Sequence, residues 1–355
     1  MSGFRMRSGG ARTWLVARVL VLCLVVLSGC ARPQLFHQEA YVFGTRVDLT
    51  IYGKSHDKAR EAMAAVLHEF DRLHHAYHAW QPSELTALNE ALARGETAVV
   101  SDELAELLRD AKQIAIDGDH LFDPAVGRLI ALWGFHADEF EPVRPDEDEI
   151  QALLDANPRM SDLTIEDNRV SSRNPAVQID LGGHAKGYAL DRAAAVLRAQ
   201  GIDNALVNIG GNVLALGSKG RTPWRLGIQH PREPRPLGVL PLYDGEAIGT
   251  SGDYQRFFEL DGERYPHLLD PRTGWPSRGT QSLTVLIMPR DDVGTWSDAT
   301  SKSPFIAGDD WREYVRRYEI EHALRVSADG TIEMTRAMRA RLEIPSDLRP
   351  VVVVD

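Results

Sequence analysis

The chain has 355 residues, of which 43% are hydrophobic and 26% are charged, and its formal net charge is −11 at pH 7. These values are typical of a globular protein and exclude a disordered or low-complexity body. The acidic balance argues against nucleic acid as a main partner, and a phosphorylated ligand would need local cations such as Lys, Arg or a metal ion.

Residues 1–29 have the pattern of an export signal. Basic residues precede the apolar run from Val19 to Leu27, and small residues then lead to Cys30. This order is typical of a secretory signal peptide, and the run is too short to span a membrane. The segment "LSGC" resembles the bacterial lipobox, which implies that Cys30 is lipidated and becomes the first mature residue.

The cysteine count supports this prediction. Of the two cysteines, Cys23 lies inside the signal, so the mature chain retains Cys30 alone, without a disulfide framework or a catalytic cysteine. We expect a lipid-anchored protein of the bacterial cell envelope that faces the periplasm. Ala31 rather than Asp follows Cys30, which favours the outer membrane but leaves both membranes open.

Helices are expected in the first half of the mature chain. Residues 30–40 are expected to be the lipidated Cys and a tether, followed by a strand over 41–52. Apolar residues three and four positions apart predict a helix over 55–75. Capping residues and the spacing of apolar residues predict three further helices, over 83–92, 101–116 and 124–133. The acidic, proline-punctuated segment 138–148 is expected to be a surface connection.

Strands are expected in the second half. After a helix that ends near Gly201, apolar runs predict strands over 205–209, 213–216, 224–229, 247–250, 257–260 and 282–287. A last helix over 310–318 precedes a hairpin with Asp329-Gly330 at its turn. Helices early and strands late indicate an α+β fold, with a mixed or antiparallel sheet packed with helices. We expect one domain over 41–335 and a C-terminal tail over 336–355.

The stretch "IDLGGHAKGYALD" (179–191) predicts either an anion site or a tight turn. Glycines stand where a helix begins, so that free N–H groups and the charge of Lys186 could hold an anion. The stretch matches neither the dinucleotide-binding pattern nor the P-loop pattern. A tight turn with a solvated Lys186 is the alternative.

Two other groups admit a catalytic or metal interpretation. "GTSGD" (249–253) could present Ser251 as a nucleophile with His267 as its base, but it lacks the spacing of a nucleophile elbow. His74 and His78 could share a helix face and bind zinc, but no H-E-x-x-H pattern accompanies them, and packing is the alternative.

Asp298 lies in the small, polar run "WSDATSKS" (296–303). A carboxylate with hydroxyl neighbours suits a cation that prefers oxygen, such as Mg²⁺. The alternative is that Asp298 caps a helix.

Seven segments in order resemble the ApbE family, the FAD:protein FMN transferases. They are "FGT" (43–45), "AWQPSELTALN" (79–89), "FDPAVG" (122–127), "IDLGGHAKGYALD" (179–191), "NIGGN" (208–212), "TSGDY" (250–254) and "HLLDPRTG" (267–274). The resemblance runs from about residue 43 to 308. It implies an ApbE-like fold with a smaller α/β subdomain, and a periplasmic enzyme that binds FAD and Mg²⁺.

The implied reaction moves the FMN half of FAD onto a Thr or Ser hydroxyl of an acceptor protein and releases AMP. The implied acceptors are subunits of membrane redox complexes, such as the sodium-pumping NADH:quinone reductase and its relatives. Two alternatives stay open. One is an FAD pyrophosphatase that splits FAD into FMN and AMP, and the other is a non-enzymatic, flavin-binding lipoprotein.

The resemblance also implies roles for single residues. Asp298 and the carbonyl of Gly183 would bind Mg²⁺. Lys302 stands where many members have a Thr ligand, so either Ser301 or water would take that place, or Lys302 would bind phosphate directly. Asp298 and His267 would be the catalytic residues, with His267 close to the phosphates or acting as base for the incoming hydroxyl. The contacts to FAD would come from His267 and from Phe43, Trp80, Leu121, Phe122, Asp123, Asp180, Lys186 and Thr250.

Overall fold

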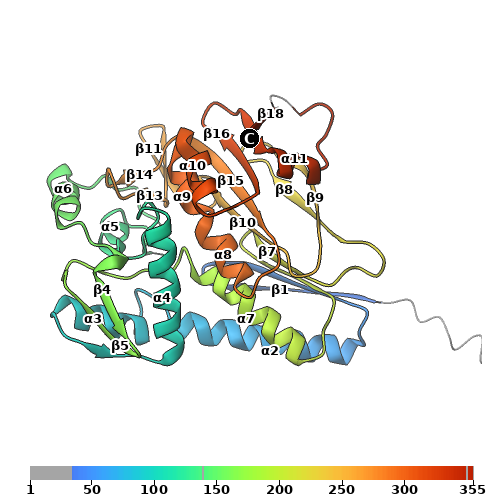
Figure 1. Ribbon diagram of the computed structural model, residues 1–355, viewed down its shortest axis with the longest axis horizontal. Coiled ribbons are helices and arrows are strands. Elements are labelled where there is room, and N and C mark those ends of the chain that lie inside the picture. The colour runs from blue at the N-terminus through green and yellow to red at the C-terminus, as the bar shows by residue number, and fades with distance from the viewer. Residues whose placement is uncertain (1–33, 138–139, 349–350, 355) are drawn as a thin grey trace, which may run out of the picture. The chain divides into compact units, whose positions relative to one another are not determined.

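A nine-stranded sheet runs through the computed structural model, which describes residues 34–137, 140–348 and 351–354 (Figure 1). Neighbouring strands are antiparallel, except that β17 and β18 are parallel. In spatial order the strands are β1 (Leu35–Val42), β2 (Thr45–Tyr52), β6 (Ala205–Ile209), β7 (Asn212–Leu216), β10 (Ala247–Gly252), β15 (Thr280–Ile287), β16 (His322–Ser327), β17 (Ile332–Thr335) and β18 (Val351–Val354).

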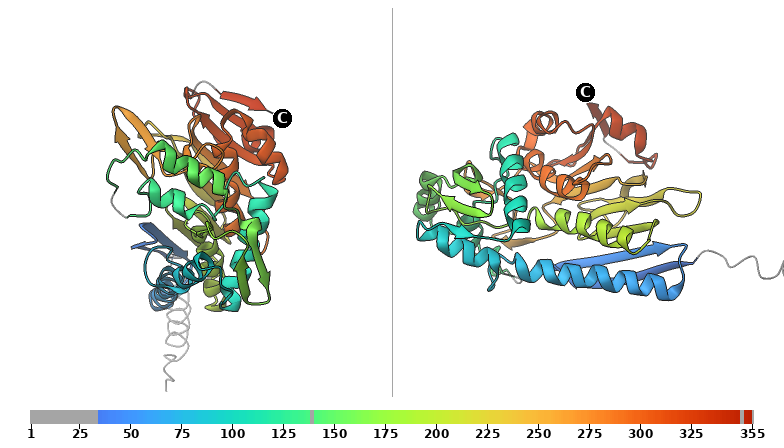
Figure 2. Two further views of the ribbon diagram at one scale, coloured as in Figure 1. Left: turned by 90° about the vertical axis from the view of Figure 1, so that its left-hand side faces the viewer. Right: turned by 60° about the horizontal axis from the view of Figure 1, so that its bottom comes forward.

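Each face of the sheet has its own core because successive side chains of a strand point to opposite faces. Along β7, Leu214 and Leu216 belong to one core, whereas Val213 and Ala215 belong to the other. Helix α2 lies along β1, as the right-hand view of Figure 2 shows. The helices of the first core are α2 (His56–Ala76), α3 (Glu84–Ala93), α4 (Asp102–Asp117), α7 (Ala185–Ala199), α8 (Val293–Thr300), α9 (Lys302–Ile306) and α10 (Trp311–Arg317).

The second core lies between the sheet and a cover of one hairpin and one helix. The elements of this cover are β8 (Trp224–Gln229), β9 (Pro236–Leu242) and α11 (Arg336–Arg341). A third, smaller core surrounds Trp133, whose ring lies 5.8 Å from that of Tyr265. It is formed by α5 (Gly127–Leu132), α6 (Glu147–Ala156), β11 (Phe257–Leu260), β12 (Glu263–Pro266), β13 (Leu269–Asp270) and β14 (Trp275–Pro276).

A small antiparallel sheet packs beside α3 and α4 at one end of the fold (Figure 1). Its strands, in spatial order, are β3 (Ala98–Val99), β5 (Arg169–Ser172) and β4 (Leu163–Glu166). Two 3₁₀ turns complete the described elements, η1 (Met160–Asp162) and η2 (Gly308–Asp310). The α+β class with a mixed sheet packed with helices is thus confirmed.

Serine side chains start three of the expected helices. The hydroxyls of Ser55, Ser83 and Ser101 each accept a hydrogen bond from a backbone N–H in the first turn of α2, α3 and α4. Such caps satisfy backbone groups that have no partner inside the helix. The boundaries predicted from the sequence are therefore correct to within one residue for these three helices.

Other boundaries differ from the predictions. The strand expected over 41–52 is the hairpin of β1 and β2, and β1 begins at Leu35, inside the expected tether. Its two-residue turn, Phe43-Gly44, has positive φ at both positions, which is the geometry of a tight hairpin turn. Helix α5 begins at Gly127 rather than at Pro124, because the N–H of Gly127 bonds to the carbonyl of Gln178.

The two terminal segments of the chain can be compared with their predicted roles only in part. The expected signal over 1–29 and the expected lipidation of Cys30 lie outside the described residues. The segment 336–355, expected to be a tail, contains α11 and β18, and β18 pairs with β17. Across the described ranges, we find no helix that combines the length and the apolarity required to cross a bilayer.

Candidate functional site

A cavity of about 590 Å³ is lined by segments that lie far apart in the sequence. Its volume is within the usual range of small-molecule sites. Most of the residues that the sequence predicted for FAD line it, namely Phe43, Trp80, Leu121, Phe122, Asp123, Asp180, Lys186 and His267. Gly183 and Lys302 line it as well, whereas Thr250, Asp298 and Ser301 do not.

Phe43 contributes an aromatic wall from the β1–β2 turn. Its φ of 57° is unusual for a bulky side chain and costs conformational free energy. The ring packs edge-on against Phe70 at 5.7 Å and against His74 at 5.9 Å, both on α2. These contacts keep the ring of Phe43 at the cavity despite the unfavourable backbone.

Trp80 and Asp180 connect two loops of the cavity. The indole nitrogen of Trp80 donates to Oδ2 of Asp180 at 2.9 Å. The other carboxylate oxygen, Oδ1, accepts from the N–H of Gly182 at 2.7 Å. The ring of Trp80 also packs at 5.1 Å from that of His136. The Asp180 carboxylate is thereby oriented from two sides at the wall of the cavity.

Asp123 shapes the turn that carries Leu121 and Phe122. Its side chain is buried, and Oδ1 accepts from the N–H groups of Ala125 at 2.9 Å and of Met160 at 3.0 Å. Oδ2 lies 2.6 Å from Nδ1 of His120. Because both oxygens have protein partners, Asp123 acts on the cavity by fixing this turn.

The glycines of the 179–191 stretch are required by close packing. A Cβ atom at Gly183 would lie 2.7 Å from Cε2 of Phe122 and 2.8 Å from Cε of Lys302. A Cβ atom at Gly187 would overlap the carbonyl oxygen of Gly294 and lie 2.7 Å from Cβ of Asp298. The backbones of α7 and α8 are therefore in direct contact where the helices cross, and any side chain larger than that of glycine at Gly187 would prevent this contact.

This crossing brings Asp298 to the N-terminal turn of α7. Asp298 is 1% exposed and lies inside α8, so the alternative that it caps a helix is wrong. Its Oδ2 accepts from the N–H of Gly187 at 2.8 Å. Its Oδ1 accepts from Nδ2 of Asn212 at 2.9 Å and from Nζ of Lys302 at 2.6 Å.

Lys302 forms a buried ion pair with Asp298. Its Nζ also lies 2.6 Å from the main-chain oxygen of Asp298, and the residue is 5% exposed. The ammonium lies 5.5 Å from the ring centre of Phe122, a favourable cation–π distance. Burial lowers the pKa of Lys302 to about 8, although the Asp298 charge acts in the opposite direction.

Ser301 and Thr250 make protein contacts near this pair. The Ser301 hydroxyl donates to the main-chain oxygen of Asp298 at 2.8 Å and lies 2.8 Å from the Ser251 hydroxyl. The N–H of Thr250 donates to Oδ1 of Asn212 at 3.1 Å. The roles predicted for Thr250 in FAD binding and for Ser301 in metal binding stay predictions.

Asn212 is a site residue that the sequence reasoning missed. It is 1% exposed at the start of β7 and connects Asp298 with Thr250. A polar side chain that opens an otherwise apolar strand was the available signal, because buried amides need partners.

His267 is held in one tautomer at the cavity wall. Its Nδ1 lies 3.1 Å from the main-chain oxygen of Arg256. A carbonyl oxygen can only accept, so Nδ1 carries the hydrogen and Nε2 keeps a free lone pair. Burial, and then the charges of Arg256 and Lys186, lower the pKa of His267 to about 3. The imidazole is therefore neutral at neutral pH, with Nε2 unprotonated.

The hydrolase and zinc interpretations find no support in the geometry. Ser251 is buried within β10, where its hydroxyl contacts Ser301, so it is not presented at a strand-to-helix elbow. The rings of His74 and His78 pack edge-on at 5.1 Å. Nδ1 of His78 accepts from the N–H groups of Trp80 and Gln81, both at 3.0 Å.

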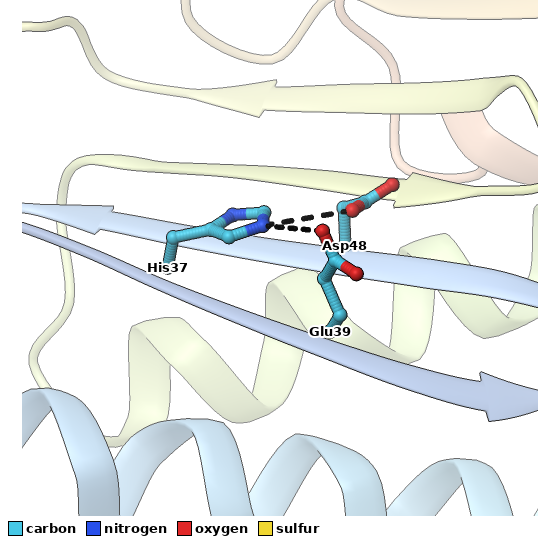
Figure 3. Close-up of side chains that lie close together, drawn as sticks. All are labelled: His37, Glu39 and Asp48. Atoms are coloured by element: carbon cyan, nitrogen blue, oxygen red, sulfur yellow. Dashed lines mark hydrogen bonds and ion pairs between the residues drawn. The ribbon is translucent and has the colours of Figure 1, made fainter.

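Among the described residues, one group of three side chains has the spacing of metal ligands. It consists of His37 and Glu39 on β1 and Asp48 on β2 (Figure 3). Nε2 of His37 lies 3.3 Å from Oε1 of Glu39 and 3.7 Å from Oδ1 of Asp48. His37 and Glu39 are exposed, and His37 already pairs with both carboxylates, an arrangement that is common without a metal ion, so no site is assigned there.

Known proteins resemble this chain in sequence. The profile of the ApbE family matches residues 43–324. The FAD:protein FMN transferase of Rhodobacter capsulatus is 44% identical over 319 residues, which cover 89% of this chain but only 60% of that protein. The FAD:protein FMN transferase of Vibrio cholerae is 32% identical, over 78% of this chain and 83% of that protein.

Solved structures resemble it in fold. The ApbE protein of Thermotoga maritima has a TM-score of 0.79 and 33% identity, covering 87% of this chain and 99% of that one. The apo flavinyl transferase ApbE of Pseudomonas stutzeri has a TM-score of 0.75 and 26% identity, covering 87% of this chain and 97% of that one. The expected ApbE-like fold is thereby confirmed.

Proposed function

This chain belongs to the ApbE family, and from that membership we propose that it is an FAD:protein FMN transferase. The observation that carries the proposal is the set of residues that line the cavity described above. Aromatic side chains, including Phe43 and Trp80, suit a flavin ring. Lys186, Lys302 and His267 border the same cavity and suit a pyrophosphate.

The proposed reaction joins FMN to a Thr or Ser hydroxyl of an acceptor protein. The hydroxyl oxygen attacks the flavin-side phosphorus of FAD, and the bond from this phosphorus to the bridging oxygen breaks. AMP leaves with the bridging oxygen, and the hydroxyl proton passes to Nε2 of His267, whose pKa rises when the negative charges of the pyrophosphate lie beside it. Phosphoryl transfer depends mainly on positioning and on electrostatic stabilisation, so the charges of Lys186 and Lys302 lower the barrier.

The donor atoms of this chain do not fit the Mg²⁺ ion implied by the resemblance. Mg²⁺ takes about six oxygen ligands at roughly 2.0–2.1 Å. Oδ1 of Asp298 already accepts from Lys302 and Asn212, and its main-chain oxygen accepts from Lys302 and Ser301. The Mg²⁺ requirement that the resemblance implies is untested, and no step above passes through a metal ion.

We also propose the acceptor class and the location. The acceptors would be flavin-carrying subunits of membrane redox complexes, such as the sodium-pumping NADH:quinone reductase or its relatives. The lipobox-like segment supports a lipid anchor at Cys30 and a position at the periplasmic face of the envelope. Anchoring would keep the enzyme close to membrane-bound acceptors.

The test is to incubate the full chain with FAD and the flavin-accepting subunit of a sodium-pumping NADH:quinone reductase. Covalent flavin fluorescence on the acceptor, with AMP released in equal amount, supports transfer. An acceptor whose target Thr is replaced by Ala is the control. Free FMN without labelling would instead establish the FAD pyrophosphatase, and bound FAD with neither product would establish a flavin-binding protein.

A further inference from the structure

We propose that the ammonium group of Lys302 is the resident cation of the phosphate site, in place of a divalent metal ion. On this proposal, which rests on the proposed function, FMN transfer by this chain does not require Mg²⁺.

The position of the ammonium is the first argument. Nζ of Lys302 lies 2.6 Å from Oδ1 and 2.6 Å from the main-chain oxygen of Asp298. Cε of Lys302 lies so close to Gly183 that a Cβ there would be 2.8 Å away. The amine therefore contacts Asp298, and the carbon that carries it packs against Gly183, the second residue that would supply an oxygen to a metal ion; both Gly183 and Lys302 line the cavity.

The hydrogen-bonding capacity of Asp298 is the second argument. A carboxylate or carbonyl oxygen accepts about two hydrogen bonds. Oδ1 has two donors, Lys302 and Asn212, and the main-chain oxygen also has two, Lys302 and Ser301. Oδ2 accepts from Gly187. A metal ion could bind these oxygens only by displacing the Lys302 ammonium from them. The ion would still be repelled by that buried positive charge close by.

The charge that FAD brings is the third argument. Its pyrophosphate carries two negative charges, which must be offset inside a cavity with little water. An ammonium has three hydrogens, of which Asp298 takes two. The third is free for a phosphate oxygen. Lys186, whose Nζ lies 3.2 Å from the carbonyl of Gly182, supplies a second positive charge at the same wall.

The helical spacing of Lys302 and Asp298 fixes the ammonium in place. Lys302 follows Asp298 by four residues, and Ser301 between α8 and α9 has helical backbone angles. Residues four apart on a helix lie on the same face. One turn of helical backbone thus places the Lys302 ammonium beside the Asp298 carboxylate. The positive charge at the phosphate site therefore does not depend on binding a metal ion.

The first experiment measures the metal dependence of the wild-type chain. Labelling of the quinone reductase subunit is followed in excess EDTA and in excess MgCl₂. We expect rates that agree within about twofold, since the cation is part of the chain. Labelling that is lost in EDTA and restored by MgCl₂ would overturn the proposal.

Variants at position 302 distinguish a role of the Lys302 charge from a role of metal binding. Lys302→Met should lower the rate on the order of 100-fold in both media, as expected for the loss of one charged donor. Lys302→Thr should be equally slow in EDTA, but its labelling rate should rise at least about tenfold with MgCl₂. The substitution removes the ammonium that blocks the Asp298 oxygens and supplies a hydroxyl that can bind the ion. Lys219→Met, at an exposed lysine after β7, is the matched control.

A binding measurement keeps the inference independent of turnover. Mn²⁺ alone is titrated into the full chain and followed by electron paramagnetic resonance. Wild type should leave Mn²⁺ free, and Lys302→Thr should bind one ion. Stoichiometric Mn²⁺ binding by wild type that Asp298→Asn removes would refute the proposal. If wild type labels no acceptor under any condition but the Vibrio cholerae transferase does, the proposed function fails, and this titration still decides the role of Lys302.

Discussion

The indole nitrogen of Trp80 donates a 2.9 Å hydrogen bond to the carboxylate of Asp180, 100 residues later in the chain. The two residues belong to different signature segments, 79–89 and 179–191, and this bond brings the segments together at the cavity wall. Because the acceptor is a carboxylate, the bond is stronger than one between neutral groups.

Trp80→Phe keeps an aromatic ring at the cavity and removes the donor. Hydrogen bonds to charged groups contribute about 1.5–3 kcal/mol, so the dissociation constant for FAD should rise by about tenfold or more. Quenching of flavin fluorescence measures this constant. Trp296→Phe, which does not line the cavity, is the control and should bind FAD as wild type does. Equal effects of the two substitutions would contradict the role of the Trp80–Asp180 bond.

Gly187→Ala should damage both the fold and the site. The new Cβ would lie 2.7 Å from that of Asp298 and overlap the carbonyl of Gly294, so α7 and α8 must separate. Overpacking of this kind costs about 1–3 kcal/mol in the free energy of unfolding, which urea denaturation measures. Gly227→Ala is the matched control, since its Cβ would meet Pro236 at an ordinary 3.5 Å. A loss of the same size in both variants would argue against the close helix crossing.

Asp298→Asn should destabilise the chain by about 3–5 kcal/mol, because it leaves the buried Lys302 ammonium without its counter-charge. Adding Lys302→Met removes that ammonium and should restore most of the free energy of unfolding, but not FMN transfer. Chemical denaturation of the two single variants and the double variant forms the test. Losses that simply add would show that the two groups are not coupled.

The stability of the chain should fall in mild acid because of His184. This side chain is fully buried, and both ring nitrogens are without a hydrogen-bond partner among the described residues. Burial lowers its pKa to about 4, from a usual value of 6.5. The unfolded chain therefore takes up the proton first, and stability that is complete above pH 6.5 is lost as the pH falls toward 4.

Between pH 7 and pH 5 this loss amounts to about 2 kcal/mol for His184 alone. Urea denaturation at the two pH values measures it. His184→Leu removes the titrating group and should reduce the difference between the two pH values by that amount. An unchanged difference in the variant would show that His184 is not its source.

The sequence predicted most of the long elements because their signals are local. The periodicity of residues 55–75 and the caps Ser55, Ser83 and Ser101 depend only on neighbouring residues. The β1–β2 turn was missed because Phe43 occupies a position where Gly or Asn is usual. Its conformation is maintained by packing on Phe70 and His74, contacts that no local pattern reveals.

The residues of the site could be predicted from the sequence, but the hydrogen bonds and ion pair that connect them could not. The signature segments identified Asp180, Lys186 and His267, which line one cavity. The contact between Lys302 and Asp298 depends on helical backbone from 298 to 302, although Ser and Thr in this run and Pro304 just after it argue against a helix. Pro304 is tolerated because it lies in the first turn of α9, where a missing N–H costs little.

The separation of the Asp298 partners along the chain has a consequence for folding. Its carboxylate bonds to Gly187 and Asn212, which are 111 and 86 residues away. Contacts of this kind close long loops, so they form late and slowly. A partly folded chain can hold every signature segment and still have no phosphate site. Acquisition of flavin binding during refolding should therefore report the last step, the docking of α8 onto α7 and β7.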